Sequence, residues 1–568
     1  EGSYGEYDRW SLKAAVNVPV TETFFMRLNG FVEQGDGYSD NLFLGTDVND
    51  VDGYGGRVAM RWLPADTVTV DFSADYYKSD QAGLYASDVA GIIRPWTGSY
   101  FDVVSGTDTS NVGETYGAAL TVNWDLGGDL ELQSITGFRN VYQRWNLDLT
   151  DQPESVFRLW TINDTDSLSQ ELKLNGTATD DRLKYTVGAF WYEEENYSFI
   201  GDEINLWFPG PNRVPLPFLS RVYDMDVTSY AFFAELQYAL SDRLTLIAGG
   251  RYTNDDKDLD ITAYAGGEVG LSPVGGVVTF DDELLESLGT PMSLDFDKFT
   301  PKLGLQYFLS EDANLYFTWA RGWKSGGWSA RTNDPAEFVV FEPETVYSYE
   351  LGLKTTVGDG RARLNYTAFY YDYTDFFSTA TGQDGNFIVF NSDAEFYGLE
   401  FEGTVRVTEN FDVFAALGWQ EGEYKDRDPE VFGTSIGEEP QRMPKWSSKV
   451  GGTYIWPLAG GSSVQLTADY QFLEDHYTNL QNSELARSGD VHIVNASIGY
   501  SFGADDRYSF SLSCTNCFDN EYITQSLDFS GINPRSDQWD GQTFNGLSFL
   551  TVYAGPPRLW RATLKANF

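Results

Sequence analysis

The sequence predicts an all-β protein: a transmembrane, antiparallel, up-and-down β-barrel of about 22 strands whose first strand is missing or truncated. Three observations support this prediction. Segments of alternating apolar and polar residues recur along the chain, short and long connections alternate between them, and aromatic residues make up 16% of the sequence. The chain ends on such a segment, whose apolar face consists of Trp560, Ala562, Leu564, Ala566 and Phe568.

The alternation itself indicates strands with two different faces. It is found at 68–76, 116–126, 230–240, 347–353, 397–407 and 464–472. Successive residues of a strand point to opposite sides of a sheet, so each segment has one apolar and one polar face. A soluble β-sandwich gives the same pattern, but its strands cluster near ~5–6 residues, whereas a membrane-spanning strand needs ~9–11. Most segments here have the membrane length, with lipid outside and water inside.

Composition favours one large repetitive domain over residues 1–568. The chain shows no compositional break and no Pro- or Ser-rich linker. Its 35 Tyr, 39 Phe and 16 Trp fit two aromatic girdles at the membrane interfaces; a large soluble all-β core is the alternative. No apolar run approaches the ~18 residues that a membrane-spanning helix needs.

The charge balance excludes nucleic acid as a partner. Lysine and arginine total 38 against 85 acids, a net charge of −47, whereas nucleic acid binding needs a basic surface. The acids concentrate in expected connections, at Asp36, Asp40, Asp47, Asp50 and Asp52, and again at Asp255, Asp256, Asp258 and Asp260. They either solvate exposed loops or hold divalent cations, including calcium or cations that bridge to anionic lipid. Their spacing identifies no ligand set.

Connections between the segments fall into two classes. The short ones carry turn residues and lie at 19–21, 64–66, 127–129, 178–182, 241–243, 310–312, 358–360, 408–410, 458–462 and 503–506. The long ones lie at 36–52, 79–113, 149–164, 201–222, 256–295, 326–343, 379–392, 425–445, 477–489 and 517–556. Outer-membrane barrels have this pattern, with short periplasmic turns and long extracellular loops.

Strand parity predicts that the chain begins inside a hairpin. Counting gives about 21 strands, whereas a single-chain barrel has an even number. The segment at 8–18 runs into a short turn, so its partner strand must precede it, and only a stub at 1–4 is available. Adding that strand gives about 22, a size at which the lumen of outer-membrane transporters is plugged.

The two cysteines leave their redox state open. Cys514 and Cys517 are three residues apart, which spans ~10 Å on an extended strand, beyond the ~7 Å limit for a disulfide. A disulfide therefore requires the strand to turn at 515–516, and a pair of free thiols is the alternative.

The sequence predicts neither catalysis nor a resident cofactor or metal. The two histidines, His476 and His492, are too few and too far apart for a metal site. No Ser/His/Asp arrangement, phosphate loop or zinc spacing can be identified.

The long loops contain candidates for ligand capture. Ring faces stack on aromatic or sugar ligands, and Arg or Lys pairs with carboxylate or catecholate oxygens. Alternatively, these aromatic residues belong to the outer girdle. The candidates are Trp323, Lys324, Trp328 and Arg331 in a Gly-rich loop and Trp207 and Arg213 in a Pro-rich loop.

The register near Arg321 raises a conflict. If Leu315, Phe317 and Trp319 face lipid, strict alternation turns Arg321 outward as well. A cation costs up to ~2–4 kcal/mol at the middle of a bilayer and ~0–1 kcal/mol near its surface. Either a bulge or a position above the membrane would remove the conflict.

Several stretches resemble the barrel of TonB-dependent outer-membrane receptors. They are FTWARGWKSGG at 317–327, FEPETVYSYELGLK at 341–354, RARLNYTAFYYDYTD at 361–375, YGLEFE at 397–402, NCFDNEY at 516–522 and the closing segment 557–568. Before residue 300 the likeness is thinner, chiefly at 8–37. Cys517 departs from the family, which usually has an aliphatic residue there.

The resemblance implies active transport across the bacterial outer membrane. The expected ligand is a small molecule, foremost an iron–siderophore complex that carries Fe³⁺. A saccharide, cobalamin or another nutrient is the alternative ligand, and a passive porin-like channel is the alternative function. The family is energised by TonB–ExbB–ExbD through an N-terminal plug and TonB box, neither of which is expected in this chain. Other implied partners are outer-membrane lipid, lipopolysaccharide and the barrel assembly machinery, which would read Trp560, Leu564 and Phe568. A monomer is expected.

Overall fold

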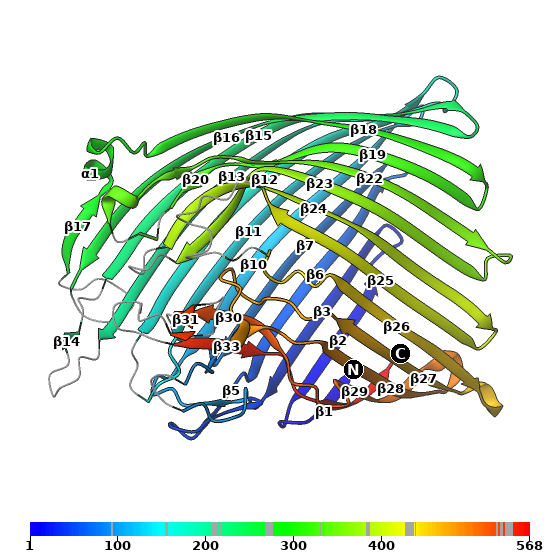
Figure 1. Ribbon diagram of the computed structural model, residues 1–568. Helices are drawn as coiled ribbons and strands as arrows, with labels where there is room; N and C mark the ends of the chain where they lie inside the picture. Colours follow the sequence, from blue (N-terminus) through cyan, green and yellow to red (C-terminus); the bar gives the residue numbers. More distant parts are fainter. Residues whose placement is uncertain are drawn as a thin grey trace.

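The protein is a closed antiparallel β-barrel, with long loops at one end and short turns at the other (Figure 1). The computed structural model describes residues 1–83, 85–91, 95–153, 157–206, 214–215, 219–266, 276–329, 331–332, 334–381, 387–425, 437, 439–529, 532–533, 538–539 and 549–568. Its wall has 22 strands, which confirms the predicted fold class. We call the two ends the long-loop end and the short-turn end.

The strands of the wall follow one another in chain order. They are β1 Gly2–Gly5, β2 Trp10–Pro19, β3 Phe24–Gly35, β6 Val51–Ala65, β7 Val68–Gln81, β10 Ser110–Gly127, β11 Leu130–Asp148, β12 Phe157–Ala178, β13 Leu183–Leu206, β15 Leu219–Ser241, β16 Leu244–Ala265, β18 Ser293–Ser310, β19 Ala313–Lys324, β22 Glu344–Val357, β23 Ala362–Thr381, β24 Phe387–Thr408, β25 Phe411–Tyr424, β26 Trp446–Pro457, β27 Ser463–Leu473, β28 Val491–Phe502, β29 Tyr508–Thr515 and β34 Leu559–Ala566.

The wall is closed by its shortest strand. β1 has four residues and pairs on one side with β2, where Gly2 faces Leu12, and on the other with β34, where Gly2 faces Leu564. β34 also pairs with β29 along its whole length. The predicted short first strand is therefore confirmed, and it lies at the predicted stub.

Each predicted short connection is a turn at the short-turn end. The long connections, however, are shorter than expected at four places, because the strands continue into them: β12 begins at Phe157, β13 ends at Leu206, β16 ends at Ala265 and β24 begins at Phe387. These strands reach 22 to 24 residues, at least twice the ~9–11 residues that a bilayer requires.

The outward face of the wall is apolar between two aromatic bands. Large exposed apolar side chains such as Leu120, Leu168 and Leu236 lie on it. In the band nearer the long-loop end, the rings of Tyr54 and Tyr76 lie 6.0 Å apart; the band nearer the short-turn end includes Trp62, Trp124 and Trp456. Of the predicted assembly residues, Trp560 and Leu564 are exposed on the outward face of β34, and Phe568 follows it.

Above the aromatic band at the long-loop end, the two faces exchange their character. On β16 the exposed residues include Asp256, Asp258 and Asp260, while Leu259 and Ile261, at the alternate positions, are buried. β12, β13, β15 and β18 likewise place acids outward at this level: Asp164, Asp166, Glu193, Glu195, Asp224, Asp226, Asp295 and Asp297. This exchange explains why the sequence suggested loops here: the segments are strands with water outside and packed loops inside.

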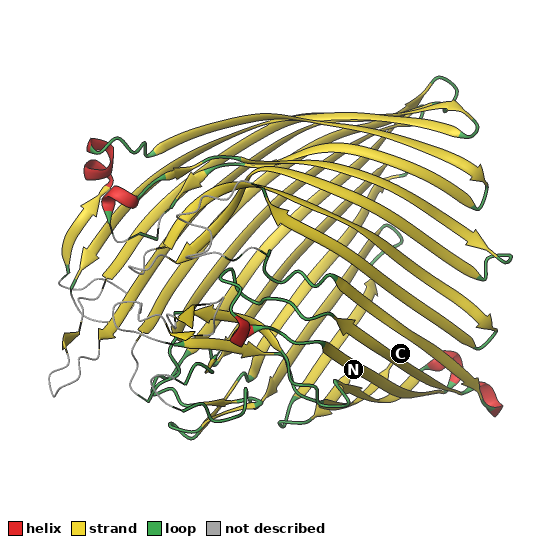
Figure 2. Ribbon diagram, in the orientation of Figure 1, coloured by secondary structure: helices red, strands yellow, loops and turns green. Residues whose placement is uncertain are grey.

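The long loops carry small sheets and a short helix of their own (Figure 2). The elements are β4 Ser39–Asn41, β5 Thr46–Val48, β8 Ser87–Asp88, β9 Asp102–Val103, β14 Val214–Pro215, β17 Val277–Asp281, α1 Asp282–Ser287, β20 Gly327–Trp328, β21 Val340–Phe341, β30 Ile523–Asp528, β31 Ile532–Asn533, β32 Gln538–Trp539 and β33 Leu550–Ala554, with 3₁₀ turns at Pro335–Glu337 and Glu484–Ala486. Two further 3₁₀ turns, Ala459–Gly461 and Ala504–Asp506, lie in short connections at the short-turn end. β8, β30 and β33 form one sheet, and β4, β5 and β9 another. Among the described residues, no helix has the length and hydrophobicity needed to cross a bilayer.

A disulfide joins Cys514 and Cys517 at the end of β29, where the Cα atoms are 5.5 Å apart. The strand turns at the predicted place, because Asn516 adopts a left-handed conformation with φ 49°. The structure thus answers the question that the spacing left open.

A charge on the outward face should destabilise the barrel strongly. Leu120 lies midway between Tyr116 and Trp124 on β10, so Leu120→Lys is expected to lower the free energy of unfolding in lipid vesicles by about 2–4 kcal/mol. The neighbouring Thr121→Lys, whose side chain faces the lumen, should change it far less. Equal losses in denaturant titrations of the two variants would contradict this assignment of faces.

Candidate ligand site inside the barrel mouth

An aromatic cavity of about 730 Å³ lies inside the barrel, toward its long-loop end. Its wall consists of inward side chains of β23, β24 and β25, and residues Pro440 to Met443 and Leu480 complete it from the loops. The volume falls in the ~300–1,000 Å³ range of small-molecule sites. Its aromatic residues are Phe369, Tyr371, Tyr373, Phe376, Phe377, Phe396 and Tyr424.

Strand alternation and two glycines position these rings. Phe369, Tyr371 and Tyr373 occupy successive inward positions of β23, and the first two stack with centroids 5.0 Å apart. Phe369 lies over Gly398, where an added Cβ would come within 2.6 Å of the ring. Phe396 lies over Gly422 in the same way, at 2.4 Å. Glycine is therefore required at both positions for the rings to lie against the wall.

A β-bulge adds one more ring to the cavity. The register of β23 and β24 shifts between Tyr373 and Phe376, and Asp375 in the bulge has φ 57°. Strict alternation would turn Phe376 outward, but the extra residue directs it inward. Its ring centroid lies 5.3 Å from that of Tyr373 and 5.8 Å from that of Phe396.

Few polar groups accompany the rings, and they carry both signs of charge. Glu400, Gln420, Gln441 and Arg442 line the cavity. Lys324 approaches it from β19, with its Nζ 4.5 Å from the ring centroid of Phe377. Such a site can stack planar groups and can pair an anionic oxygen with Arg442 or Lys324.

The structure separates the residues proposed from the sequence. Lys324 lies beside the cavity, whereas Trp323 is on the opposite, outward face of β19, across from Thr345. Trp328 and Arg331 lie in the loop that follows β19. Trp207 and Arg213 lie outside the described residues. The binding role of these residues stays a prediction.

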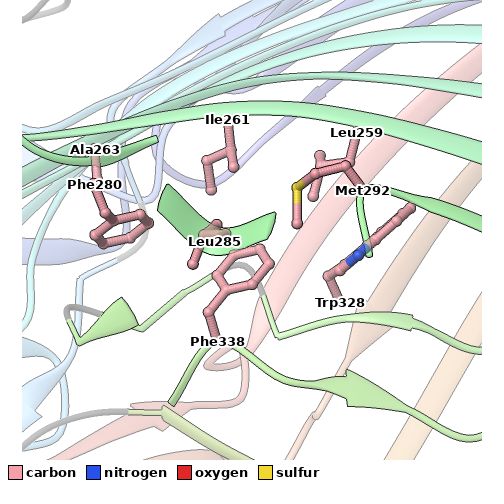
Figure 3. Packing of buried hydrophobic residues seen from close by; sticks show 8 residues of the cluster. All are labelled: Leu259, Ile261, Ala263, Phe280, Leu285, Met292, Trp328 and Phe338. Carbon is pink, nitrogen blue, oxygen red and sulfur yellow. The ribbon is translucent and has the colours of Figure 1, made fainter. Parts of the chain in front are cut away.

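Trp328 is part of a buried apolar cluster that fills the inside of the extended strands (Figure 3). Its side chain is 8% exposed, and its indole Nε1 donates a hydrogen bond to the carbonyl of Pro291 at 2.7 Å. Leu259 and Ile261 of β16, Leu285 of α1 and Phe338 pack with it. In this arrangement Trp328 fixes the loop to the wall.

Arg331 joins a buried charge cluster that sequence reasoning missed. Arg221 of β15 is 1% exposed; its Nη1 donates to Asp202 Oδ2 at 2.8 Å, and its Nε donates to the carbonyl of Thr332 at 2.9 Å. Arg331 lies on the other side of Asp202, at 3.7 Å. No sequence signal marked this cluster, because its members come from three separate segments. It holds the loop after β19 inside the barrel mouth.

Three buried aspartates hold a second group of loops together. Asp151 accepts a hydrogen bond from the backbone N–H of Asp88 at 2.9 Å, and Asp88 accepts one from that of Leu550 at 3.2 Å. Asp148 accepts from the Ser105 hydroxyl at 2.6 Å and from the Thr150 N–H at 3.0 Å. Burial raises the pKa of Asp148 despite these bonds. These acids connect loop segments that are far apart in the sequence.

No cluster of three or more His, Cys, Asp or Glu side chains with metal-binding geometry is present in the part of the chain that the structure describes. The outward acids are spread along the strands. Divalent cations at the loops stay a prediction.

The raised pKa of Asp148 makes the stability of this loop group depend on pH. A carboxyl whose folded pKa is raised stabilises the folded form fully below its ordinary value of 3.8, and this stabilisation is lost as the pH rises through the folded pKa. Hydrogen exchange of 85–91, 95–107 and 148–152, corrected for intrinsic rates, should therefore show protection that declines as the pH rises. Asp148→Asn should flatten the decline, and the exposed Asp125→Asn should not. If protection in Asp148→Asn declines with pH as steeply as in the wild type, the titration of Asp148 is not the cause of the decline.

Comparison with known proteins identifies the family. The family described as "TonB dependent receptor-like, beta-barrel" matches residues 61–517. The rhizobactin receptor of Rhizobium meliloti (strain 1021) is 23% identical over 310 residues, which cover 53% of this chain and 39% of the relative. The pesticin receptor of Yersinia enterocolitica is 22% identical over 402 residues, 68% of this chain and 49% of the relative. The chain thus spans less than half the length of these curated relatives.

Solved structures share the fold over the whole chain. The ferric yersiniabactin uptake receptor FyuA from Yersinia pestis has a TM-score of 0.78 at 16% identity, covering 100% of this chain and 79% of that one. The siderophore receptor PiuA from Acinetobacter baumannii has a TM-score of 0.74 at 12% identity, covering 100% and 81%. The chain therefore belongs to the TonB-dependent receptor family, and its barrel lies in the bacterial outer membrane.

Proposed function

We propose that the barrel takes part in the active import of an iron–siderophore complex, energised through TonB. The observation that carries the proposal is the aromatic cavity on the inner wall at the extracellular, long-loop end of a 22-strand barrel. A ligand there would meet ring faces and the guanidinium of Arg442, with the ammonium of Lys324 next to the ring of Phe377. Ferric chelates combine planar groups with anionic oxygens and suit both.

The names of similar proteins support this ligand class. Two of them are receptors for rhizobactin and ferric yersiniabactin, and a third is called a siderophore receptor. In this proposal the imported complex carries Fe³⁺, and the protein acts as a receptor and transporter without catalysis. TonB–ExbB–ExbD, lipopolysaccharide and the barrel assembly machinery are its proposed partners, and a monomer its proposed state.

Charge narrows the class of chelate. The chain has a net charge of −47, and the outer sides of β12 to β18 carry acids, so a polyanion would be repelled at long range. The cavity itself contains Glu400 besides Arg442. A chelate of small net charge with aromatic groups therefore fits better than a highly anionic one. The same argument keeps a neutral saccharide or cobalamin as the second candidate.

Ligand binding by the purified protein tests the proposal. Quenching of intrinsic fluorescence should report binding of one ferric chelate from a panel of catecholates, phenolates and hydroxamates. Phe396→Ala is expected to weaken that binding about tenfold, or ~1.4 kcal/mol, because it removes a ring from the cavity wall.

Phe414→Ala is the matched control, since Phe414 also faces inward on β25 but lies outside the cavity. It should leave binding unchanged. If cobalamin or a saccharide binds and no ferric chelate does, the proposed ligand class is wrong and that nutrient takes its place. Equal losses in both variants would reject the cavity as the site, and the absence of saturable binding by every ligand tested would favour a passive channel.

A further inference from the structure

A second cavity, of about 1000 Å³, lies on the inner wall across the lumen from the aromatic cavity. We call it the arginine basin. About half of the wall separates its strands, β3, β6, β7 and β10, from β23 to β25 in either direction, as the blue and yellow strands of Figure 1 show. The polar side chains in its lining include Arg27, Arg57, Arg61, Asp71, Ser73 and Thr121.

Strand alternation on β6 shows that the basin faces the lumen. Tyr54 and Trp62 are exposed on the outward face, in the aromatic bands nearer the long-loop end and the short-turn end respectively. Arg57, Ala59 and Arg61 have the opposite parity and therefore point inward. They lie between the levels of the two bands, so the basin extends from the middle of the membrane toward its periplasmic side.

The same alternation excludes Arg321 from the lumen. β19 pairs with β22 without a register shift, so Arg321 faces outward like Phe317 and Trp319. It lies one outward position beyond Trp319 toward the extracellular end. This position above the aromatic band, and not a bulge, removes the conflict that the sequence raised.

Small residues form the floor of the basin, and arginines surround it. Ala59 pairs with Arg27 on one side and with Ser73 on the other, and Ser73 pairs in turn with Ala119. Directly paired residues have Cβ atoms ~4.5–5.5 Å apart, and same-face neighbours along one strand are ~7 Å apart. Arg27 and the two arginines of β6 therefore lie on three sides of Ala59, and the Ser73 hydroxyl lies on the fourth.

Two arginines of the basin have no carboxylate partner. Arg27 Nε donates a hydrogen bond to Asn29 Oδ1 at 2.9 Å, and Arg57 Nη2 donates one to Ser73 Oγ at 3.1 Å. Both acceptors are neutral, and neither arginine forms an ion pair within the described residues. A guanidinium has five donors in a planar fork, so most of the donors of both side chains remain for water or an external anion.

The acids beside the basin are each bound to another arginine. Asp71 accepts hydrogen bonds from Arg61 Nε and Nη2 at 2.7 and 3.0 Å. Asp75, which pairs with Arg57 across the strands, accepts from Arg139 Nη1 and Nη2 at 2.5 and 3.2 Å. Four arginines thus accompany two aspartates, which leaves an excess of two positive charges. A cavity with one prevailing sign of charge between low-dielectric walls concentrates ions of the opposite sign.

We propose that the arginine basin binds a compact polyanion through its carboxylate or phosphate oxygens, between Arg27 and Arg57. Guanidinium forks pair with both kinds of oxygen in bidentate geometry, and the alanine floor leaves room for one anion to contact both arginines. In the import proposed above, the basin is a second binding point for the anionic groups of a ligand that leaves the aromatic cavity toward the periplasm. That role rests on the proposed function, whereas anion binding itself does not.

Isothermal titration calorimetry of the purified protein with citrate and with inorganic phosphate, at low ionic strength in a nonionic detergent, tests the site. At least one of the two anions should bind saturably, and more weakly as NaCl is added. Arg27→Gln and Arg57→Gln should each weaken this binding about tenfold, because each removes a charge-assisted contact. Binding of citrate alone identifies carboxylate groups as the ligand, and binding of phosphate alone identifies free phosphate.

Two further variants distinguish the basin from the general charge of the lumen. Ala59→Phe fills the floor without changing any charge and should also weaken binding. Asp71→Asn removes the carboxylate that holds Arg61, so a third guanidinium becomes available and binding should strengthen. The two variants thus predict opposite effects.

Matched controls carry the same substitutions at inward positions outside the basin. They are Arg363→Gln on β23, Ala416→Phe on β25 and Asp469→Asn on β27, where Asp469 is paired with Lys449. Each should keep the wild-type affinity, and all variants should resist SDS until heated.

Two results would overturn the proposal. The first is the absence of saturable binding of either anion, which would leave the basin as a docking surface for acidic groups of another protein segment. The second is an equal change in a basin variant and its matched control. Neither result depends on the binding of a ferric chelate at the aromatic cavity, so a failure of this inference can be distinguished from a failure of the proposed function.

Discussion

The whole structure depends on one constraint: a backbone amide inside a bilayer finds no water, so each must bond to another strand. A sheet satisfies this only when it has no free edge. Here the four residues of β1 join the two ends of the sheet, because they pair with Trp10 to Leu12 of β2 and with Arg561 to Leu564 of β34. This closure turns alternation along each strand into a fixed inside and outside, and both the aromatic cavity and the packing of the loops against the inner wall follow from it.

The outer face of the barrel wall contacts two different media, lipid in the membrane and water above it. Within the membrane the apolar residues point outward, whereas above it Leu259 and Ile261 point inward and acids point outward. The strand geometry does not change between the two zones; only the medium on each side does. As a result the extended strands offer the loops an apolar inner surface, against which Trp328 and Phe338 pack. The mouth of the barrel is therefore built from wall and loops together.

Local sequence patterns predicted much of the fold and little of the site. Alternation and turn residues determine strands such as 116–126 and their turns, and parity revealed the short first strand. The strands beyond the membrane were missed because a run such as Asp256 to Asp260 has the composition of a loop. The inward position of Phe376 depends on a bulge, and the pairing of Arg221 with Asp202 and Thr332 depends on contacts between distant segments. Neither the bulge nor these long-range contacts produce a periodic pattern in the sequence.

The apolar inner surface of the tall hairpins restricts how this receptor can vary. Shortening the segment between β19 and β22 would uncover Leu259, Ile261 and Ala263 to water, at a cost of about 25 cal/mol for each Å² exposed. Insertions and deletions in this segment are thus tolerated only where they spare this packing. The outward acids lie on the opposite face of the wall, where Asp258 and Asp295 accept hydrogen bonds from Ser293 and Asn254. Substitutions of these acids leave the inner packing intact, so the outer surface of this part of the molecule can vary without a change in its interior.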